Sequence, residues 1–256
     1  MTVLLEMKNV VKKFGGITAL SDISFNVEKG DIFGIIGPNG AGKTTIFNMI
    51  TGVYPVTSGD VLLNGESLIG KKTHEIVNAG IARTFQNIRL FSNMTVLEHI
   101  LVGHHGRMKT GLAGSLFHTS SMKQEEKDAV EEAHELLRYV GLDDVADHLA
   151  TELPYGKQRK LEIARAMAAR PQLILLDEPA AGMNDSETAA LIELIRGIRE
   201  QFNITIILIE HDMNLVMTLC NRLIVVNFGR MLAQGTPAEV QNNPAVIEAY
   251  LGKEDA

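Results

Sequence analysis

The sequence predicts an α/β fold with a mainly parallel sheet. Apolar runs with the length and composition of buried strands occur at 31–37 ("DIFGIIG"), 173–178 ("LILLDE"), 204–210 ("ITIILIE") and 222–229 ("RLIVVNFG"). Helical segments separate them, notably 186–201. Strands that alternate with helices favour parallel pairing, so these runs are expected to share one sheet.

The first ninety residues contain further short strands. "ISFNV" (23–27) alternates as a half-buried strand does, and "DVLLNG" (60–65) predicts a strand that runs into an Asn-Gly turn. Between them, "GKTTIFNMITG" (42–52) has Ile46, Met49 and Ile50 at helical spacing and Gly52 as a stop signal.

The character of the chain changes near residue 92. "MTVLEHILVGHH" indicates a helix, 106–121 is small and polar and therefore predicted as a loop, and 122–142 is a charged amphipathic helix closed by Gly141. The apolar face of that helix comprises Ala129, Ala133, Leu136, Leu137 and Val140. We expect 92–165 to form a mostly helical insertion, and 236–252 to form short closing helices.

Composition excludes several classes of protein. The chain has 256 residues, 45% of them hydrophobic and 21% charged, as in an ordinary globular protein of one large or two small domains. Its net charge of −7 argues against a nucleic-acid-binding platform. The densest basic run, "KQRK" (157–160), is interpreted as a solvated helix start. The single cysteine, Cys220, is expected to fill a packing position, and the histidines lack metal-ligand spacing.

The sequence offers no membrane-spanning candidate. The N-terminal segment lacks the apolar stretch and cleavage site of a signal peptide. The longest strongly apolar run is 204–209, whereas a membrane helix needs roughly 20 residues. We therefore expect a soluble, cytoplasmic protein whose membrane role, if it has one, depends on a partner.

One motif predicts a polyphosphate site. Residues 37–44, "GPNGAGKT", fit G-x-x-x-x-G-K-[ST], with a predicted strand before the motif and a predicted helix after it. The glycines allow backbone N–H groups to point at phosphate oxygens, and the helix start adds positive potential. Lys43 is expected to reach the β- and γ-phosphates, and Thr44 to offer its hydroxyl to Mg²⁺.

Polar residues follow two of the predicted strands. Asp177 ends the run 173–178 and is placed to hold Mg²⁺ through water, while Glu178 could polarise the attacking water. Adjacent strand residues face opposite sides, so the strand must end there for both to act. His211 follows the strand 204–210 and is expected near the γ-phosphate; Gln86 follows the strand-like run "IARTF".

These motifs, in this order, resemble those of ABC-type ATPases, over essentially the whole chain. The set comprises the phosphate loop, the Q-loop Gln86, a signature segment at 153–158, the strand with Asp177 and Glu178, the D-loop "AAGMND" and the switch His211. The resemblance implies a P-loop NTPase (RecA-like) core at 1–91 and 166–240 with an antiparallel β edge. It also implies an inserted helical subdomain at 92–165 and short helices at 241–256, all in one ATP-binding domain.

The same resemblance implies roles for individual residues. Glu178, His211 and Gln86 would be catalytic, Gln86 would link Mg²⁺ and the attacking water to the helical subdomain, and Mg²⁺ would be held by Thr44, Gln86 and Asp177. Phe14 would stack on adenine, although it could instead be an aromatic at the rim of the core. The implied ATP contacts are Phe14, Gly37, Pro38, Asn39, Gly40, Ala41, Gly42, Lys43, Thr44 and Thr45.

The signature departs from the usual Leu-Ser-Gly-Gly-Gln of the family. Pro154 replaces the serine and Tyr155 replaces the first glycine, while Gly156, Lys157 and Gln158 complete the segment that would meet ATP on an opposite subunit. Backbone N–H groups at the helix start remain available for an anion. In the D-loop, Asn184 stands where aspartate is usual, which keeps hydrogen bonding without the charge.

Longer segments resemble one branch of the family. The stretches 83–100, 155–167, 177–184 and 208–217 and the ending "NNPAVIEAYLG" are similar to the ATP-binding subunit of branched-chain amino acid importers. That resemblance implies transmembrane permease partners, a second cassette subunit and, indirectly, a substrate-binding protein, with the chain on the cytoplasmic face of the membrane. Ile88, Leu90, Phe91 and Met94 would accept a permease helix, unless they are buried inside the subdomain.

Three other functions share part of this pattern. A lipopolysaccharide-type exporter ATPase has the same cassette and would differ in its membrane partner. A non-transport ABC ATPase usually carries a coiled coil or a second cassette, and neither occurs here. A P-loop small-molecule kinase is disfavoured by the signature-like segment and His211.

Overall fold

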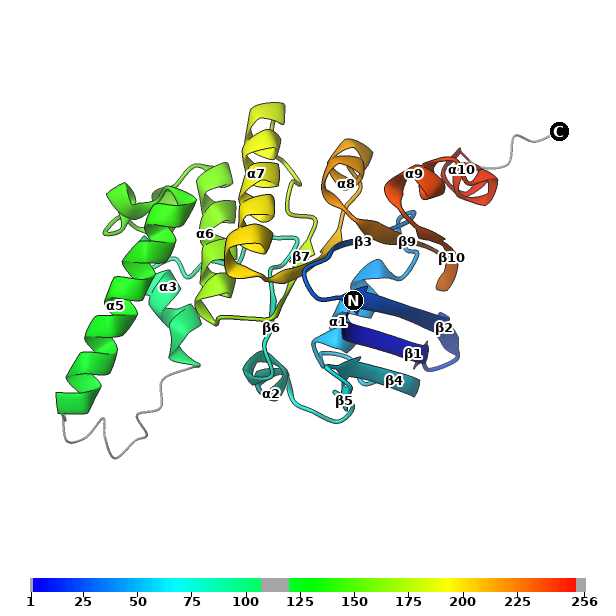
Figure 1. Ribbon diagram of the computed structural model, residues 1–256, viewed down its shortest axis with the longest axis horizontal. Coiled ribbons are helices and arrows are strands. Elements are labelled where there is room, and N and C mark those ends of the chain that lie inside the picture. The colour runs from blue at the N-terminus through cyan, green and yellow to red at the C-terminus, as the bar shows by residue number, and fades with distance from the viewer. Residues whose placement is uncertain (1, 107–119, 252–256) are drawn as a thin grey trace. The chain divides into compact units, whose positions relative to one another are not determined.

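The computed structural model of the chain describes residues 2–106 and 120–251 and divides into two compact units (Figure 1). The first unit comprises Met1–Arg83 and Gln172–Ala256, and the second comprises Thr84–Pro171. The second unit therefore includes the irregular segment that contains Gln86, ahead of the helical insertion that we expected at 92–165. No helix within the described ranges is long and apolar enough to cross a bilayer.

The first unit contains a six-stranded sheet. Its strand order is β10-β9-β3-β8-β7-β6, and the neighbours from β9 to β6 are parallel, whereas β10 is antiparallel to β9. The mainly parallel sheet predicted from the sequence is thus confirmed. The strands are β3 (Ile32–Ile36), β6 (Ile81–Arg83), β7 (Leu173–Asp177), β8 (Thr205–Ile209), β9 (Arg222–Asn227) and β10 (Arg230–Gly235).

A four-stranded antiparallel sheet with order β2-β1-β4-β5 forms the expected antiparallel part of the fold. Its strands are β1 (Val3–Phe14), β2 (Ile17–Glu28), β4 (Ser58–Leu63) and β5 (Glu66–Ser67). The sequence did not predict β1 as a strand. Register shifts along the β1–β2 pair break its alternation, for example beside Asn9, which has a left-handed backbone with φ of 46°.

The helices of the first unit include α1, which lies in the same hydrophobic cluster as residues of both sheets. These helices are α1 (Lys43–Ile50), α2 (Thr73–Asn78), α7 (Asp185–Phe202), α8 (Met213–Leu219), α9 (Pro237–Gln241) and α10 (Pro244–Leu251). Asn184 caps α7 by accepting from the amide of Glu187. Cys220, after α8, is buried as expected, and burial raises the pKa of its thiol to about 12.

In the second unit, α3, α5 and α6 pack against one another (Figure 1). The helices are α3 (Val96–His105), α5 (Ser120–Val140) and α6 (Tyr155–Ala168), with short 3₁₀ turns at η1 (Asp143–Val145) and η2 (Ala150–Glu152). Gly141, with φ of 72°, ends α5 as predicted. The predicted loop 106–121 is wrong at its end, because α5 begins at Ser120; residues 107–119 lie outside the described ranges.

Candidate functional site

The phosphate-loop motif connects β3 to α1 in the first unit. Gly37 and Gly42 have φ values of 149° and 109°, in the region that favours glycine. Space imposes the same requirement at Gly37, because a Cβ there would overlap the backbone carbonyl oxygen of Val226, whereas a Cβ on Gly42 would meet the end of the Leu20 side chain, which can move. The loop can therefore hold this shape only with glycine at both positions.

Lys43 is buried within the loop at 6% exposure. Its Nζ donates to the carbonyl oxygens of Gly37 (2.7 Å) and Pro38 (2.9 Å). Burial lowers the pKa of Lys43, and the nearby carboxylates of Glu178 and Asp177 oppose that shift. The ammonium group of Lys43 therefore lies against the loop backbone, close to Asp177 and Glu178, the two acidic residues that the sequence singled out.

The N-terminus of α1 supplies further donors. Gly42 occupies the N-cap position and no side chain caps the helix, so its first backbone N–H groups remain available to an anion. Thr44 is exposed and Thr45 half-buried, whereas Ala41 is buried. Pro38 is half-buried, and Asn39 and Gly40 are exposed.

Glu178 and His211 meet at the carboxyl edge of the sheet. β7 ends at Asp177, as the sequence argument required, and Glu178 turns the chain with a left-handed φ of 47°. Its Oε1 lies 2.8 Å from Nε2 of His211, which follows the parallel neighbour β8. A non-glycine residue at positive φ costs free energy, and strained residues of this kind cluster at functional sites.

Glu210 supports this pair, although the sequence reasoning did not single it out. It is 4% exposed and accepts hydrogen bonds from the amides of Ala180 (2.8 Å) and His211 (3.0 Å). Burial raises its pKa, and the amide donors oppose the shift. Glu210 therefore ties the end of β8 to the turn that follows Glu178.

Asp177 takes part in a buried ion pair that the sequence reasoning also missed. It is 3% exposed, and its Oδ2 accepts from Nη2 of Arg83 at 2.8 Å. The other Arg83 nitrogen, Nη1, donates to Oδ1 of Asn48 in α1 at 2.7 Å. Arg83 thereby links Asp177 to the helix that follows the phosphate loop.

Phe14 is 43% exposed at the end of β1. Its ring makes an edge-to-face contact with Tyr54 at a centroid distance of 5.2 Å, and Nζ of Lys12 lies 4.7 Å from its centroid. An aromatic ring that is exposed and supported from the side can stack on a base. Phe14 is therefore not a buried core residue.

The chemistry of these residues fits a magnesium nucleotide. The loop and the start of α1 provide backbone N–H groups and the ammonium of Lys43 for phosphates. Phe14 provides an exposed aromatic ring for a base. Thr44 and Asp177 carry the oxygen ligands that Mg²⁺ prefers.

The second unit carries Gln86 and the signature-like segment. Gln86 is exposed, and its carbonyl oxygen accepts from Arg159 at 2.8 Å. Tyr155 begins α6 and is 42% exposed; Gly156 is buried, Lys157 is half-buried, and Gln158 donates to the carbonyl of Leu153. Pro154 caps α6 without a side-chain hydrogen bond.

The interpretation of "KQRK" as a solvated helix start is wrong at Arg159. That side chain is completely buried (0% exposed), whereas Lys157, Gln158 and Lys160 are half-buried. Charge alone could not reveal this, because burial of an arginine depends on partners that lie far away in the sequence.

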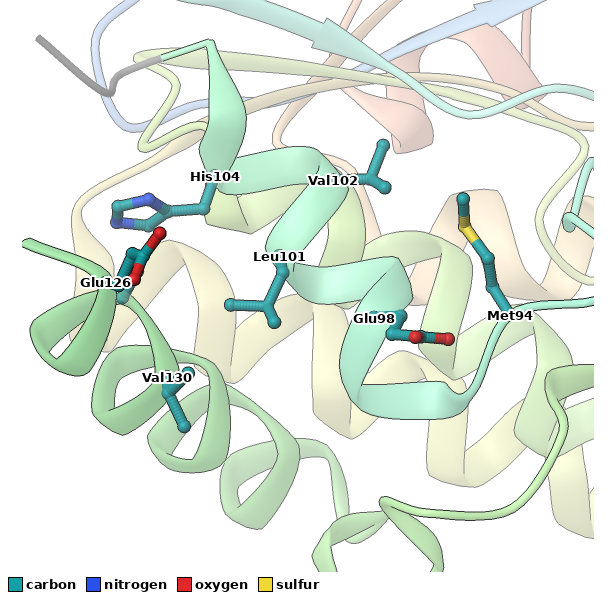
Figure 2. A pocket seen from close by; sticks show the side chains of 8 residues that line it. Met94, Glu98, Leu101, Val102, His104, Glu126 and Val130 are labelled. Atoms are coloured by element: carbon teal, nitrogen blue, oxygen red, sulfur yellow. The ribbon is translucent and has the colours of Figure 1, made fainter. Parts of the chain in front are cut away.

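A pocket of about 530 Å³ lies between α3 and α5 of the second unit (Figure 2). Figure 2 shows Leu101 and Val130 along its length, with His104 and Glu126 at one end and Met94 and Glu98 at the other. The full lining is Met94, Glu98, Leu101, Val102, His104, Glu126, Ala129 and Val130. Of the four residues that we expected to form a groove, Met94 lines this pocket and Phe91 is 51% exposed, whereas Ile88 and Leu90 are half-buried.

Substitution of Lys43 by alanine should raise the dissociation constant for Mg-ATP by roughly 10- to 100-fold. In the proposed complex Lys43 donates to phosphate oxygens, and a hydrogen bond from a charged donor contributes about 1.5–3 kcal/mol, which corresponds to roughly 10- to 100-fold in affinity. Isothermal calorimetry measures the change, with Lys71→Ala, near Glu66 on the surface, as the control. An unchanged affinity in Lys43→Ala would refute the assignment of the phosphate loop.

Two family profiles match the sequence. A profile described as "ABC transporter" matches residues 20–181. A second, described as "Branched-chain amino acid ATP-binding cassette transporter", matches residues 230–256, which include β10, α9 and α10.

Curated proteins resemble the chain over nearly its whole length. The high-affinity branched-chain amino acid transport ATP-binding protein BraF of Pseudomonas aeruginosa is 45% identical over 250 residues, which cover 98% of each chain. The corresponding protein LivG of Escherichia coli K12 is 46% identical over the same share of both chains.

Solved structures have the same fold. The ADP conformation of MJ1267, an ATP-binding cassette of an ABC transporter, superposes with a TM-score of 0.85 at 32% identity and covers 99% of this chain and 100% of its own. A dimeric post-hydrolysis state of the ATP-binding cassette MJ0796, bound to ADP and Pi, gives 0.77 at 25% identity, covering 91% of this chain and 99% of its own.

Proposed function

Since this chain belongs to the ABC transporter family, we propose that it is the ATP-binding and hydrolysing subunit of an importer for branched-chain amino acids. The contact between Glu178 and His211 beside the phosphate loop carries the hydrolytic part of the proposal, because it pairs a base with a residue that orients it. The cargo is supported by the similarity to BraF and LivG over 98% of the chain.

Binding relies on residues of the first unit. The backbone donors at the start of α1 and the ammonium of Lys43 neutralise the β- and γ-phosphates, and Phe14 stacks on adenine. Lys43 exchanges its hydrogen bonds with Gly37 and Pro38 for bonds to phosphate oxygens. Thr44, Gln86 and, through water, Asp177 would hold Mg²⁺, which would neutralise part of the phosphate charge.

Hydrolysis needs a water molecule that attacks the γ-phosphorus. As its oxygen forms a bond to phosphorus, the bond from phosphorus to the β–γ bridging oxygen breaks, and ADP leaves with inorganic phosphate as the second product. The carboxylate of Glu178 accepts the proton of the water, and His211 orients that carboxylate through the 2.8 Å contact. The resemblance to the family adds Gln86 to the proposed catalytic residues.

A second cassette subunit, either a copy of this chain or a related one, would complete each nucleotide site. Tyr155, Gly156, Lys157 and Gln158 would present the N-terminus of α6 to the ATP of that subunit, because backbone N–H groups there lack a side-chain cap. Such a sandwich closes with ATP and opens after hydrolysis, and the motion would drive the permease subunits. The structure of MJ0796 as a dimer supports this arrangement.

The pocket between α3 and α5 is the proposed contact for a permease. Val102 and Val130 are 41% and 37% exposed at its margin, and Glu98 and Glu126 add negative charge. A permease helix with an apolar face and a basic residue would complement both features. The chain would then sit on the cytoplasmic face of the membrane, with a substrate-binding protein on the other side.

Reconstitution tests the proposal directly. The chain, co-expressed with the branched-chain amino acid permease subunits of its own genome, should support ATP-dependent leucine uptake into vesicles that contain the binding protein. Val130→Asp should abolish co-purification with the permease while leaving ATP hydrolysis by the isolated subunit unchanged. Val77→Asp, at a valine of similar exposure (39%) outside the pocket, is the matched control.

Two results would contradict the proposal in different ways. Co-purification with lipopolysaccharide-export proteins in place of amino acid permeases would overturn the cargo and the direction of transport. Normal permease binding by Val130→Asp would exclude the pocket as the docking surface.

A further inference from the structure

Arg159 is a completely buried arginine one turn into α6. An arginine that is hidden from water needs partners for its charge and its donors. Its Nη1 donates to Oε2 of Glu162 and to the carbonyl oxygen of Phe85, each at 2.8 Å. Its Nη2 donates to the carbonyl of Gln86 at 2.8 Å and approaches the hydroxyl of Tyr155 at 3.3 Å.

Glu162 and Arg165 also bind the backbone of the segment that contains Phe85 and Gln86. Glu162 is 1% exposed, and its Oε1 accepts from the amide of Phe85 at 3.3 Å. Arg165, one turn further along α6, donates to the carbonyl of Arg89 at 2.7 Å. We call Arg159, Glu162 and Arg165 the backbone clamp, because all three hold main-chain atoms of residues 85–89.

The held segment has no regular structure of its own. Residues 84–91 form neither helix nor strand, so their backbone groups cannot satisfy one another through a regular ladder. A planar guanidinium that binds two successive carbonyls fixes the orientation of the intervening peptide more narrowly than a single donor could. The clamp thus determines how the backbone at Gln86 is presented.

Stability alone does not explain a buried ion pair at this position. Apolar residues of similar volume often replace such a pair without loss of stability, because removing two charges from water is costly. The pair does, however, join two functional segments: Tyr155, which occupies a glycine position of the usual signature, shares the guanidinium of Arg159 with Gln86.

We propose that Arg159 and Glu162 are positioning residues that lock the backbone at Gln86 to the start of α6, so that Gln86 and Tyr155 keep one relative orientation throughout the ATPase cycle. This inference rests on the proposed function, in which Gln86 acts in hydrolysis and Tyr155 faces the second subunit. Tyr155 then helps to position the guanidinium of Arg159, because its hydroxyl accepts a hydrogen bond from that group.

The decisive variant is the double substitution Arg159→Met and Glu162→Met, which removes both buried charges and keeps the volume. We expect the double variant to remain folded, its kcat to fall about 10- to 100-fold and its affinity for ATP to remain unchanged. Arg159→Lys keeps the positive charge but cannot donate to both carbonyls with a planar guanidinium, so its kcat should lie between those of the double variant and the wild type. Arg170→Met, which breaks an ion pair with Glu132 in the same unit, should leave kcat unchanged.

Hydrogen–deuterium exchange gives a readout that does not need activity. Amides of residues 85–90 should exchange faster in the double variant and at the wild-type rate in Arg170→Met. Wild-type kcat, or unchanged exchange at 85–90, in a folded double variant would overturn the inference. Absence of ATP hydrolysis in the wild-type chain itself would overturn the proposed function, so the two failures are distinguishable.

Discussion

Substitution of Glu178 by glutamine is expected to slow ATP hydrolysis by roughly 100- to 10,000-fold while ATP remains bound. Glutamine has nearly the same shape and keeps a hydrogen bond to His211, but it cannot accept a proton from water. The binding residues of the phosphate loop are untouched, so the dissociation constant for Mg-ATP should not rise.

Phosphate release under single-turnover conditions measures the loss, and equilibrium binding of nucleotide measures what is retained. Glu193→Gln makes the same chemical change in α7, where the carboxylate is exposed and pairs with Arg196, and should leave the rate unchanged. Turnover at the wild-type rate in Glu178→Gln would remove Glu178 from the catalytic role.

Replacement of Arg83 by methionine should lower the free energy of unfolding by about 3–5 kcal/mol. The side chains of Arg83 and Asp177 are 7% and 5% exposed, so the substitution leaves a buried carboxylate without its counter-charge. It also removes the bond to Asn48 and the contact with the ring of Phe47, which lies 5.4 Å from the guanidinium.

Urea denaturation followed by circular dichroism measures this loss. Arg222→Met is the matched control, since the pair Arg222–Glu28 is 34% and 25% exposed and spans 3.5 Å; its removal should cost at most about 1 kcal/mol. Arg83→Lys should recover part of the loss by keeping the charge. Equal midpoints for Arg83→Met and the wild type would show that the ion pair makes no net contribution.

Local patterns in the sequence predicted much of the fold. The buried strands β3, β7, β8 and β9 are short apolar runs, and the comparison structures confirm the P-loop ATPase fold to which they belong. β10 was missed because each of its residues is exposed or half-buried, so no buried apolar run marks the strand. β1 was missed because its bulges interrupt the alternation on which the prediction depends.

The same distinction applies to the candidate site. Lys43, Glu178 and His211 were found because each lies in a motif or directly after a strand. Arg83 and Arg159 were not found, because their partners lie far away in the sequence. Arg83 pairs with Asp177, and Arg159 binds the backbone of Phe85 and Gln86. Only the folded chain shows that these charges are buried.

Within the phosphate loop, Lys43 donates to the carbonyl oxygens of Gly37 and Pro38. A phosphate that binds this ammonium would therefore take the place of acceptors that Lys43 already has. When the product departs, the lysine returns to carbonyls that are already in place. The buried charge of Lys43 thus has oxygen acceptors both before a phosphate arrives and after it leaves, so the ammonium need not lose its proton at either stage.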